Sequence, residues 1–258
     1  MSTSDLFSVE GKVAVVTGGS RGIGEMVAAA LVEHGASVVI ASRKADELEA
    51  TAGRLRQVGD CTAIAADLSS YDGARALAAA VAERHEAVHV LVNNAGATWG
   101  EDVATYPEHG FDKVLDVNVK GVFALTQALL PQLRAAGTAI EPASVVNVGS
   151  IDGIRVPAFE SYAYSASKAA VHQLTRHLAA RLAREHVRVN AIAPGLFPSR
   201  MTAFMLEQAE EQIVEATPLH RIGGPDDMAG AILFLASRAS AFVTGAVLPV
   251  DGGVATCR

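Results

Sequence analysis

Three side chains that could together transfer a proton lie close in the sequence: Ser150, Tyr164 and Lys168. Tyr164 and Lys168 are four residues apart, so on a helix they would share one face. A free tyrosine has a pKa near ~10, and a neighbouring cation would lower that pKa by favouring the phenolate. Ser150 could hydrogen-bond the oxygen whose proton is exchanged. The spacing indicates a proton-transfer site, although the same Tyr–Lys spacing also occurs in simple surface pairs.

The elements that must position these residues can be recognised from apolar patterning. Residues 163–174 have the spacing of a helix, which would carry Tyr164 and Lys168. Helical stretches rich in alanine and leucine alternate with seven short strand-like segments: KVAVVTGG, SVVIA, CTAIAAD, VHVLVNN, ASVVNVGS, VRVNAIAP and AVLPV. Strands separated by helices predict a parallel sheet with right-handed crossovers. We therefore expect an α/β chain: a single-domain Rossmann fold over residues 1–258, with a doubly wound sheet of about seven strands.

The composition limits the classes of function. The 258 residues carry a formal net charge of −7 with no basic patch, which argues against nucleic-acid binding. The first residues lack the pattern of a secretory signal, and no apolar run reaches membrane-spanning length, so no membrane association is expected. Two cysteines fit a reducing cytoplasm. The eight histidines form no convincing metal-binding set, so no metal is expected.

A glycine-rich loop follows the first strand. TGGSRGIG places Gly18, Gly22 and Gly24 where a pyrophosphate could approach the backbone and the amino end of the next helix. A plain strand-to-helix turn could use the same glycines. The strand before the loop and the helix after it favour a dinucleotide site.

The end of the second strand selects the dinucleotide. An acidic residue there would bind the ribose hydroxyl of NAD, but Ser42 and Arg43 occupy the position. Arg21 in the glycine loop could reach the same phosphate, so NADP(H) is the expected cofactor. The alternative for Arg43 is a solvated charge at a helix start.

Polar residues also follow the third and fourth strands. Asp67 could accept a hydrogen bond from an adenine amino group, or it could serve as a turn or helix-capping residue. The NNAG segment, residues 93–96, could carry the backbone past the cofactor, or it could form a simple turn.

The least regular segment, residues 195–224, follows the sixth strand. Its flanking Pro194 and Gly195 resemble hinges, which favours a mobile lid over a ligand crevice. The alternative is an amphipathic helix that packs its large apolar side chains into the core: Phe197, Met201, Phe204 and Met205.

The motifs TGGSRGIG, NNAG, NVKG, VGS, YSASK, PG and DGG occur in this order. From about residue 12 to about residue 253 the chain resembles the short-chain dehydrogenase/reductase family. The resemblance implies an NAD(P)-dependent oxidoreductase in which Tyr164 gives up a proton to a carbonyl, with Ser150 and Lys168 assisting. It also implies that Asn118 completes a catalytic tetrad by holding a water; a helix kink is the structural alternative for this residue.

The resemblance further assigns a set of cofactor-binding residues: Gly18, Ser20, Arg21, Gly22, Ile23, Gly24, Ser42, Arg43, Asp67, Leu68, Asn94, Ala95, Gly96, Tyr164, Lys168, Pro194 and Gly195. Within the family, the chain is most similar to 3-oxoacyl reductases of the rhamnolipid-biosynthesis type. This implies reduction of a 3-oxoacyl thioester or related ketone by NADPH. A dehydrogenase of steroid, sugar or xenobiotic alcohols and a non-catalytic NADP(H)-binding regulator are the alternatives.

The family also implies a homotetramer built partly through the helices that carry Asn118 and Tyr164. Its members that act on acyl carrier protein are expected to dock the carrier through two arginines. Glu141 and Ala180 stand at the nearest matching positions here, with Arg134 and Arg181 nearby. Docking of a carrier is therefore left open.

Overall fold

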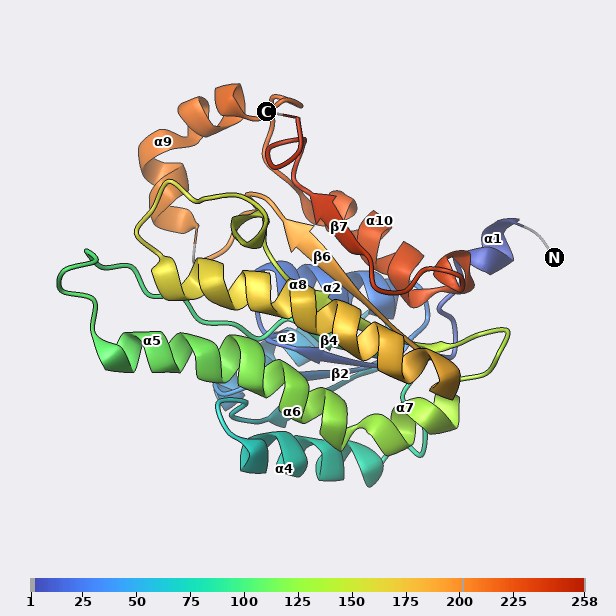
Figure 1. Cartoon of the computed structure of the whole chain (residues 1–258). Helices are drawn as coiled ribbons and strands as arrows, with labels where there is room; N and C mark the ends of the chain where they lie inside the picture. Colours follow the sequence, from blue (N-terminus) through green and yellow to red (C-terminus); the bar gives the residue numbers. More distant parts are fainter. Residues whose placement is uncertain (1–2, 201, 258) are drawn as a thin grey trace.

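The computed structural model describes residues 3–200 and 202–257, and it contains a single parallel sheet between two layers of helices (Figure 1). The strands are β1 (Val13–Thr17), β2 (Ser37–Ser42), β3 (Cys61–Ala65), β4 (Val90–Asn93), β5 (Ala143–Val148), β6 (Val187–Pro194) and β7 (Val247–Val250). The helices are α1 (Thr3–Leu6), α2 (Gly22–Glu33), α3 (Ala45–Leu55), α4 (Tyr71–Ala82), α5 (Glu108–Leu115), α6 (Gly121–Ala128), α7 (Leu130–Ala136), α8 (Tyr162–Leu182), α9 (Ala203–Ala216) and α10 (Pro225–Ala236). Shorter helical turns are η1 (Asp116–Lys120), η2 (Ile151–Gly153), η3 (Ala183–Glu185) and η4 (Arg238–Ser240).

The sheet has the order β3-β2-β1-β4-β5-β6-β7, and all neighbouring strands are parallel. The chain builds outward from β1 to β3 on one side and then from β4 to β7 on the other. The direction therefore reverses between β1 and β4, where Val15 pairs with Val39 on one side and Leu91 on the other. Ligands bind doubly wound sheets at such a reversal, beyond the carboxyl ends of the strands. The fold predicted from the sequence is confirmed.

The central strands are buried on both faces, which explains their nearly continuous apolar sequences. Successive residues alternate between two cores: Val16 packs into a cluster with α2, α3 and α10, whereas Val15 packs into one with α4, α6, α7 and α8. Both side chains are fully buried. The two cores hold the sheet rigid and leave the loops at its carboxyl edge to form a site.

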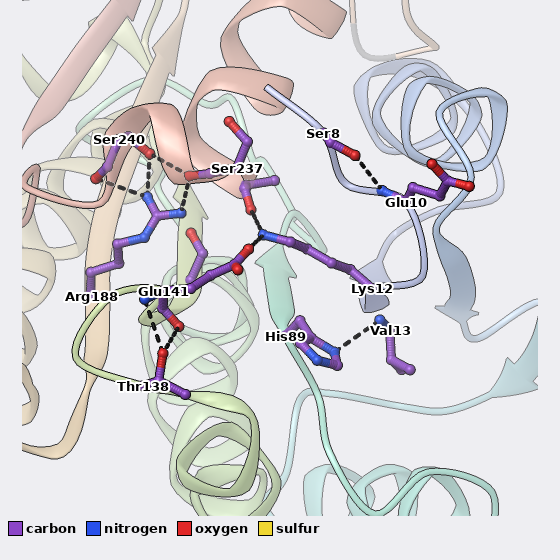
Figure 2. Close-up of polar contacts among 12 residues, drawn as sticks. Ser8, Glu10, Lys12, Val13, His89, Thr138, Glu141, Arg188, Ser237 and Ser240 are labelled. Carbon is purple, nitrogen blue, oxygen red and sulfur yellow. Dashed lines mark hydrogen bonds and ion pairs between the residues drawn. The ribbon is translucent and has the colours of Figure 1, made fainter. Parts of the chain in front are cut away.

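Opposite that edge, a polar cluster joins the amino ends of the strands (Figure 2). Lys12 Nζ lies 2.7 Å from Glu141 Oε1 and donates a hydrogen bond of 3.0 Å to the carbonyl of Ala236. Nearby, Arg188 donates to the carbonyl of Ser237 at 2.8 Å. Glu141 lies on the loop before β5 and stands at one of the two positions where the family would have a carrier-docking arginine. Here it forms an ion pair with Lys12 at the start of β1.

Candidate functional site

The glycine loop has the backbone shape that its sequence predicts. Gly18 and Gly22 have positive φ angles of +65° and +55°, which side chains disfavour. A Cβ on Gly24 would lie 2.2 Å from the carbonyl oxygen of Gly18. The amide of Asn94 braces the loop from β4, since its Nδ2 donates to the carbonyl of Thr17 at 2.9 Å. The glycines thus shape a concave backbone at the amino end of α2, which suits a pyrophosphate.

The first asparagine of NNAG has a different role from the second. Asn93 is buried and donates to Asn147 on β5 at 2.9 Å and to Thr126 on α6 at 3.1 Å. Asn147 in turn donates to Thr175 on α8 at 2.9 Å. This polar chain fixes the helix that carries Tyr164 against the strand that ends in the cofactor loop. The segment is therefore more than a simple turn.

A cluster of positive charge lies where β2 ends. Arg21, Arg43, Lys44 and Arg200 line one cleft, together with the carboxylate of Glu47. Ser42 Oγ is buried there and has no hydrogen-bond partner in residues 3–200 and 202–257. A hydroxyl without a partner and several cations in the same cleft fit a phosphate group. The residues present therefore fit NADP(H) better than NAD(H). NAD(H) would need a carboxylate at the end of β2 to accept a hydrogen bond from its ribose hydroxyl, and Ser42 and Arg43 occupy that place.

The same cleft contains the three residues proposed to exchange protons. Ser150 follows β5 and caps η2, and Tyr164 and Lys168 face the cleft from one side of α8. Lys168 is buried; its Nζ donates to the carbonyl of Val148 at 2.8 Å and lies 5.4 Å from the centre of the Tyr164 ring. The helix, the strand end and the glycine loop thus meet around one space.

The electrostatics of this pair differ from the sequence-based expectation. Loss of hydration raises the pKa of Tyr164 to about 12; the hydrogen bond with Ser150 lowers that pKa only partly, and Asp152 raises it further. Burial lowers the pKa of Lys168 to about 8. The Lys168 ammonium lies over the Tyr164 ring and donates its hydrogen bond to the carbonyl of Val148. The pKa of the Tyr164 phenol is raised in the protein without cofactor, so the prediction that Lys168 lowers it is wrong there. Desolvation of both groups outweighs their proximity.

Asn118 is the one predicted catalytic residue that does not line the cleft. It lies in η1, a π-helical turn between α5 and α6. Its Oδ1 accepts a bond of 2.8 Å from the amide of Ala97, and its Nδ2 donates to the Ala97 carbonyl at 3.0 Å and to Ser167 at 2.9 Å. The side chain therefore ties the loop after β4 to α8, while the helix is distorted at this residue.

Each of the predicted cofactor-binding residues lines the cleft. Asp67 Oδ1 also accepts a bond from the Ser69 amide at 3.0 Å, and this bond, with a smaller contribution from Arg43, lowers the pKa of Asp67. Asp67 is thus a turn residue that also faces the cleft. Three further residues that line the cleft were not predicted from the sequence: Lys44, Glu47 and Arg200. The charged residues after Arg43 could have indicated the first two, but no sequence motif pointed to Arg200.

The segment proposed as a lid contains both an anchor and an outlying helix. Phe197 is 2% exposed and packs against Gly223, where an added Cβ would lie 2.5 Å from its ring. Helix α9 then lies apart from the sheet, at the upper left of Figure 1. Met201 is outside the residues that the structure describes, as is the side chain of Phe204. The segment is therefore partly core, through Phe197, and Ser199, Arg200 and Thr202, just before α9, line the cleft.

Two aromatic residues near the site do not enter the cleft. Tyr162, two residues before Tyr164, is exposed and packs edge-on against Tyr106. Trp99 packs on Gly110 of α5, and Lys113 lies 5.3 Å from its ring centre. Trp99 is thus a loop anchor. In the described part of the chain there is no cluster of three or more His, Cys, Asp or Glu residues suited to a metal, and no helix long and apolar enough to cross a membrane.

A dinucleotide-type glycine loop, a Tyr–Lys pair on one helix and a serine after β5 together define an oxidoreductase of the Rossmann type. The chain belongs to the short-chain dehydrogenase/reductase family, since residues 18–255 match the family model described as Enoyl-(Acyl carrier protein) reductase.

Individual relatives agree over their whole length. The chain is 50% identical to the rhamnolipids biosynthesis 3-oxoacyl-(acyl-carrier-protein) reductase of Pseudomonas aeruginosa, over 96% of this chain and 97% of that one. It is 40% identical to a galactitol 2-dehydrogenase of Cereibacter sphaeroides, with 98% of each covered. Among solved structures, the Pseudomonas aeruginosa RhlG/NADP active-site complex superposes with a TM-score of 0.94 at 48% identity, covering 97% of this chain and 99% of that one.

Proposed function

We propose that this protein is an NADPH-dependent carbonyl reductase that converts a 3-oxoacyl thioester or a related ketone to the hydroxy compound. One observation carries the proposal: Ser150, Tyr164 and Lys168 line the same cleft as the glycine loop and the cationic end of β2. The Pseudomonas reductase, at 50% identity, supports the thioester as substrate. The solved RhlG complex supports NADP as cofactor.

The cofactor would be held by the residues already described along the cleft. The amino end of α2 and the glycines would take the pyrophosphate, and Ser42 with Arg43 and Arg21 would take the phosphate on the ribose. Asp67, Leu68 and the loop from Asn94 to Gly96 would border the adenosine and the adjoining ribose. Pro194 and Gly195 would lie along the nicotinamide end. When bound, NADPH supplies the hydride.

The chain itself supplies orientation and the proton. Tyr164 would donate its phenolic proton to the carbonyl oxygen as negative charge develops there, and Ser150 would hydrogen-bond the same oxygen. With its pKa raised, Tyr164 stays protonated at neutral pH, as a donor in the reducing direction must. Lys168 would hold the nicotinamide ribose in place beside Tyr164.

Asn118 would act through position. Its bonds to Ala97 and Ser167 hold the cofactor loop against α8, where Tyr164 lies. Its family role of holding a water would then fall to the backbone of the distorted turn rather than to the side chain, whose polar atoms are all engaged.

We also propose that residues 1–258 form one functional domain and that residues 195–224 form its substrate lid.

Assembly and location complete the proposal. We propose a homotetramer through the face where the α5–α6 region and α8 lie side by side (Figure 1), and a cytoplasmic location that suits the free thiols of Cys61 and Cys257. Arg134, one candidate for binding an acyl carrier protein, is paired with Glu185 at 2.5 Å. A coenzyme A thioester or another ketone is therefore as suitable a substrate as a carrier-bound one. Light scattering that gave a monomer mass would remove the tetramer from the proposal.

The test follows NADPH oxidation by its absorbance with acetoacetyl-CoA, a longer 3-oxoacyl-CoA, the matching carrier-bound thioester and a panel of sugar and steroid ketones. We expect the highest kcat/KM with a 3-oxoacyl thioester, and a higher kcat/KM with NADPH than with NADH. Turnover of sugar ketones alone would favour the alternative that the galactitol 2-dehydrogenase relative suggests. Tight NADPH binding without turnover of any ketone would favour a non-catalytic regulator.

A further inference from the structure

Glu47 in the first turn of α3 holds cations from three separate elements. Its Oε2 lies 3.0 Å from Arg21 of the glycine loop, and its Oε1 lies 2.8 Å from Lys44 at the start of α3. The same Oε1 lies 3.7 Å from Arg200, which belongs to the segment between β6 and α9. All four side chains line the cofactor cleft. A carboxylate thus stands among the cations that a phosphate would need.

A hydrogen-bonded turn at the start of the proposed lid fixes the position of Arg200. Thr202 Oγ1 donates to the carbonyl of Phe197 at 2.6 Å and accepts from the amide of Ser199 at 2.9 Å, which closes a tight turn. Phe197 is buried, and an added Cβ on Gly22 would lie 3.2 Å from that of Ser199. The turn therefore rests on the glycine loop, and α9 begins immediately after it at Ala203.

The charges at this corner match a phosphate better than they match Glu47 alone. Arg21, Lys44 and Arg200 carry three positive charges against one carboxylate. The hydrogen bond from Lys44 keeps the pKa of Glu47 below its usual value, so the carboxylate is ionised at neutral pH. A phosphate monoester carries a charge of roughly −1.5 to −2 at neutral pH and three acceptor oxygens. Ser42 Oγ, unpartnered within the described residues, borders the same cleft.

We propose that Glu47 and Arg200 make the lid respond to the 2′-phosphate of the cofactor. Glu47 holds the three cations when no phosphate is present, the phosphate displaces its carboxylate when NADPH binds, and Arg200 then ties the start of α9 to the bound cofactor. The proposal rests on the NADP(H) binding proposed above. NADH, which lacks the phosphate, leaves Arg200 with Glu47 and does not order the lid in this way.

Equilibrium binding tests the two residues separately from turnover. Dissociation constants for NADPH, NADH and 2′,5′-ADP are measured by fluorescence and calorimetry for the wild type, Arg200→Gln and Glu47→Gln. Arg200→Gln should weaken NADPH and 2′,5′-ADP about threefold to tenfold, as expected for one partly exposed charge contact, and change NADH by less than about twofold. Glu47→Gln should tighten NADPH by about twofold to fivefold, because it removes a competing anion.

Hydrogen exchange of the amides in residues 203–216 reports on the lid. NADPH and 2′,5′-ADP should slow this exchange in the wild type, whereas NADH should slow it less. In Arg200→Gln the protection by NADPH should fall to the level given by NADH. Glu207→Gln, which removes an exposed charge of α9 that does not line the cleft, is the matched control and should behave as the wild type.

The outcomes distinguish this proposal from the proposed function. If the wild type binds NADPH more tightly than NADH but Arg200→Gln weakens both equally, or neither, Arg200 does not contact the phosphate and the inference is overturned. Weaker NADPH binding in Glu47→Gln would also overturn it, since Glu47 would then assist the phosphate. A wild type that does not prefer NADPH would instead refute the proposed cofactor itself.

Discussion

Replacing Asn118 with alanine tests how the cofactor loop is joined to the catalytic helix. The side chain is 1% exposed and makes three hydrogen bonds of 2.8, 3.0 and 2.9 Å, two with Ala97 and one with Ser167. Each such bond contributes about 0.5–1.5 kcal/mol, and a buried group left unpaired costs about 1–3 kcal/mol. Because Ala97 is only partly buried, water can replace some of these contacts. We expect Asn118→Ala to lower the free energy of unfolding by about 2–4 kcal/mol.

Urea unfolding provides the assay. Trp99, the single tryptophan, lies two residues beyond Ala97, so its fluorescence reports on this loop, and circular dichroism reports on the helices. Agreement of the two transitions permits a two-state free energy.

Asn190→Ala is the matched control, because Asn190 is equally buried and bonds Val243 and Ala246 away from the cleft. Both variants should lose stability, but only Asn118→Ala should also weaken NADPH binding. A loss below about 1 kcal/mol in Asn118→Ala, or unchanged binding, would refute the proposed connection.

Two further predictions concern the glycine loop and the buried lysine. Gly24→Ala should abolish measurable NADPH binding, because the new Cβ would lie 2.2 Å from the carbonyl oxygen of Gly18. The control is Gly53→Ala on α3, where the new Cβ meets nothing within 4 Å and should stabilise the protein by up to about 1 kcal/mol. Equal NADPH binding by both variants would contradict this account. Between pH 8 and 10.5 unfolded Lys168 binds more protons than folded Lys168, whose pKa is about 8, so stability from this residue should rise with pH. From pH 7 to pH 10 the difference in unfolding free energy between wild type and Lys168→Met should therefore move by roughly 2.5 kcal/mol in favour of the wild type. Urea titration measures this difference, and a value that does not change with pH would contradict the prediction.

Much of the site could be predicted because short motifs fix the ends of parallel strands. Gly18, Asp67 and Asn94 follow three different strands and Ser42 ends a fourth, and the carboxyl ends of these strands meet at one edge of the sheet. Once the strands were recognised from their apolar patterns, the cleft followed. The helical spacing likewise placed Tyr164 and Lys168 on one face.

The remaining features depend on contacts between distant parts of the chain. Glu141 reaches Lys12 only because the loop before β5 folds back to the start of β1. The hydrogen bonds of Asn118 depend on where the loop at Ala97 lies, and Arg200 reaches Glu47 through the turn that Phe197 anchors. The raised pKa of Tyr164 depends on how much water the folded chain excludes, which local spacing cannot specify.

The most direct test of the central claim compares Tyr164→Phe with Tyr162→Phe. Both phenols begin α8, but only Tyr164 lines the cleft. NADPH oxidation with a 3-oxoacyl thioester is followed by absorbance, and NADPH binding is measured in parallel by fluorescence. Tyr164→Phe should lose turnover by at least about a hundredfold and still bind NADPH, whereas Tyr162→Phe should retain most of its turnover. Comparable losses in both variants, or a fully active Tyr164→Phe, would contradict Tyr164 as the proton donor.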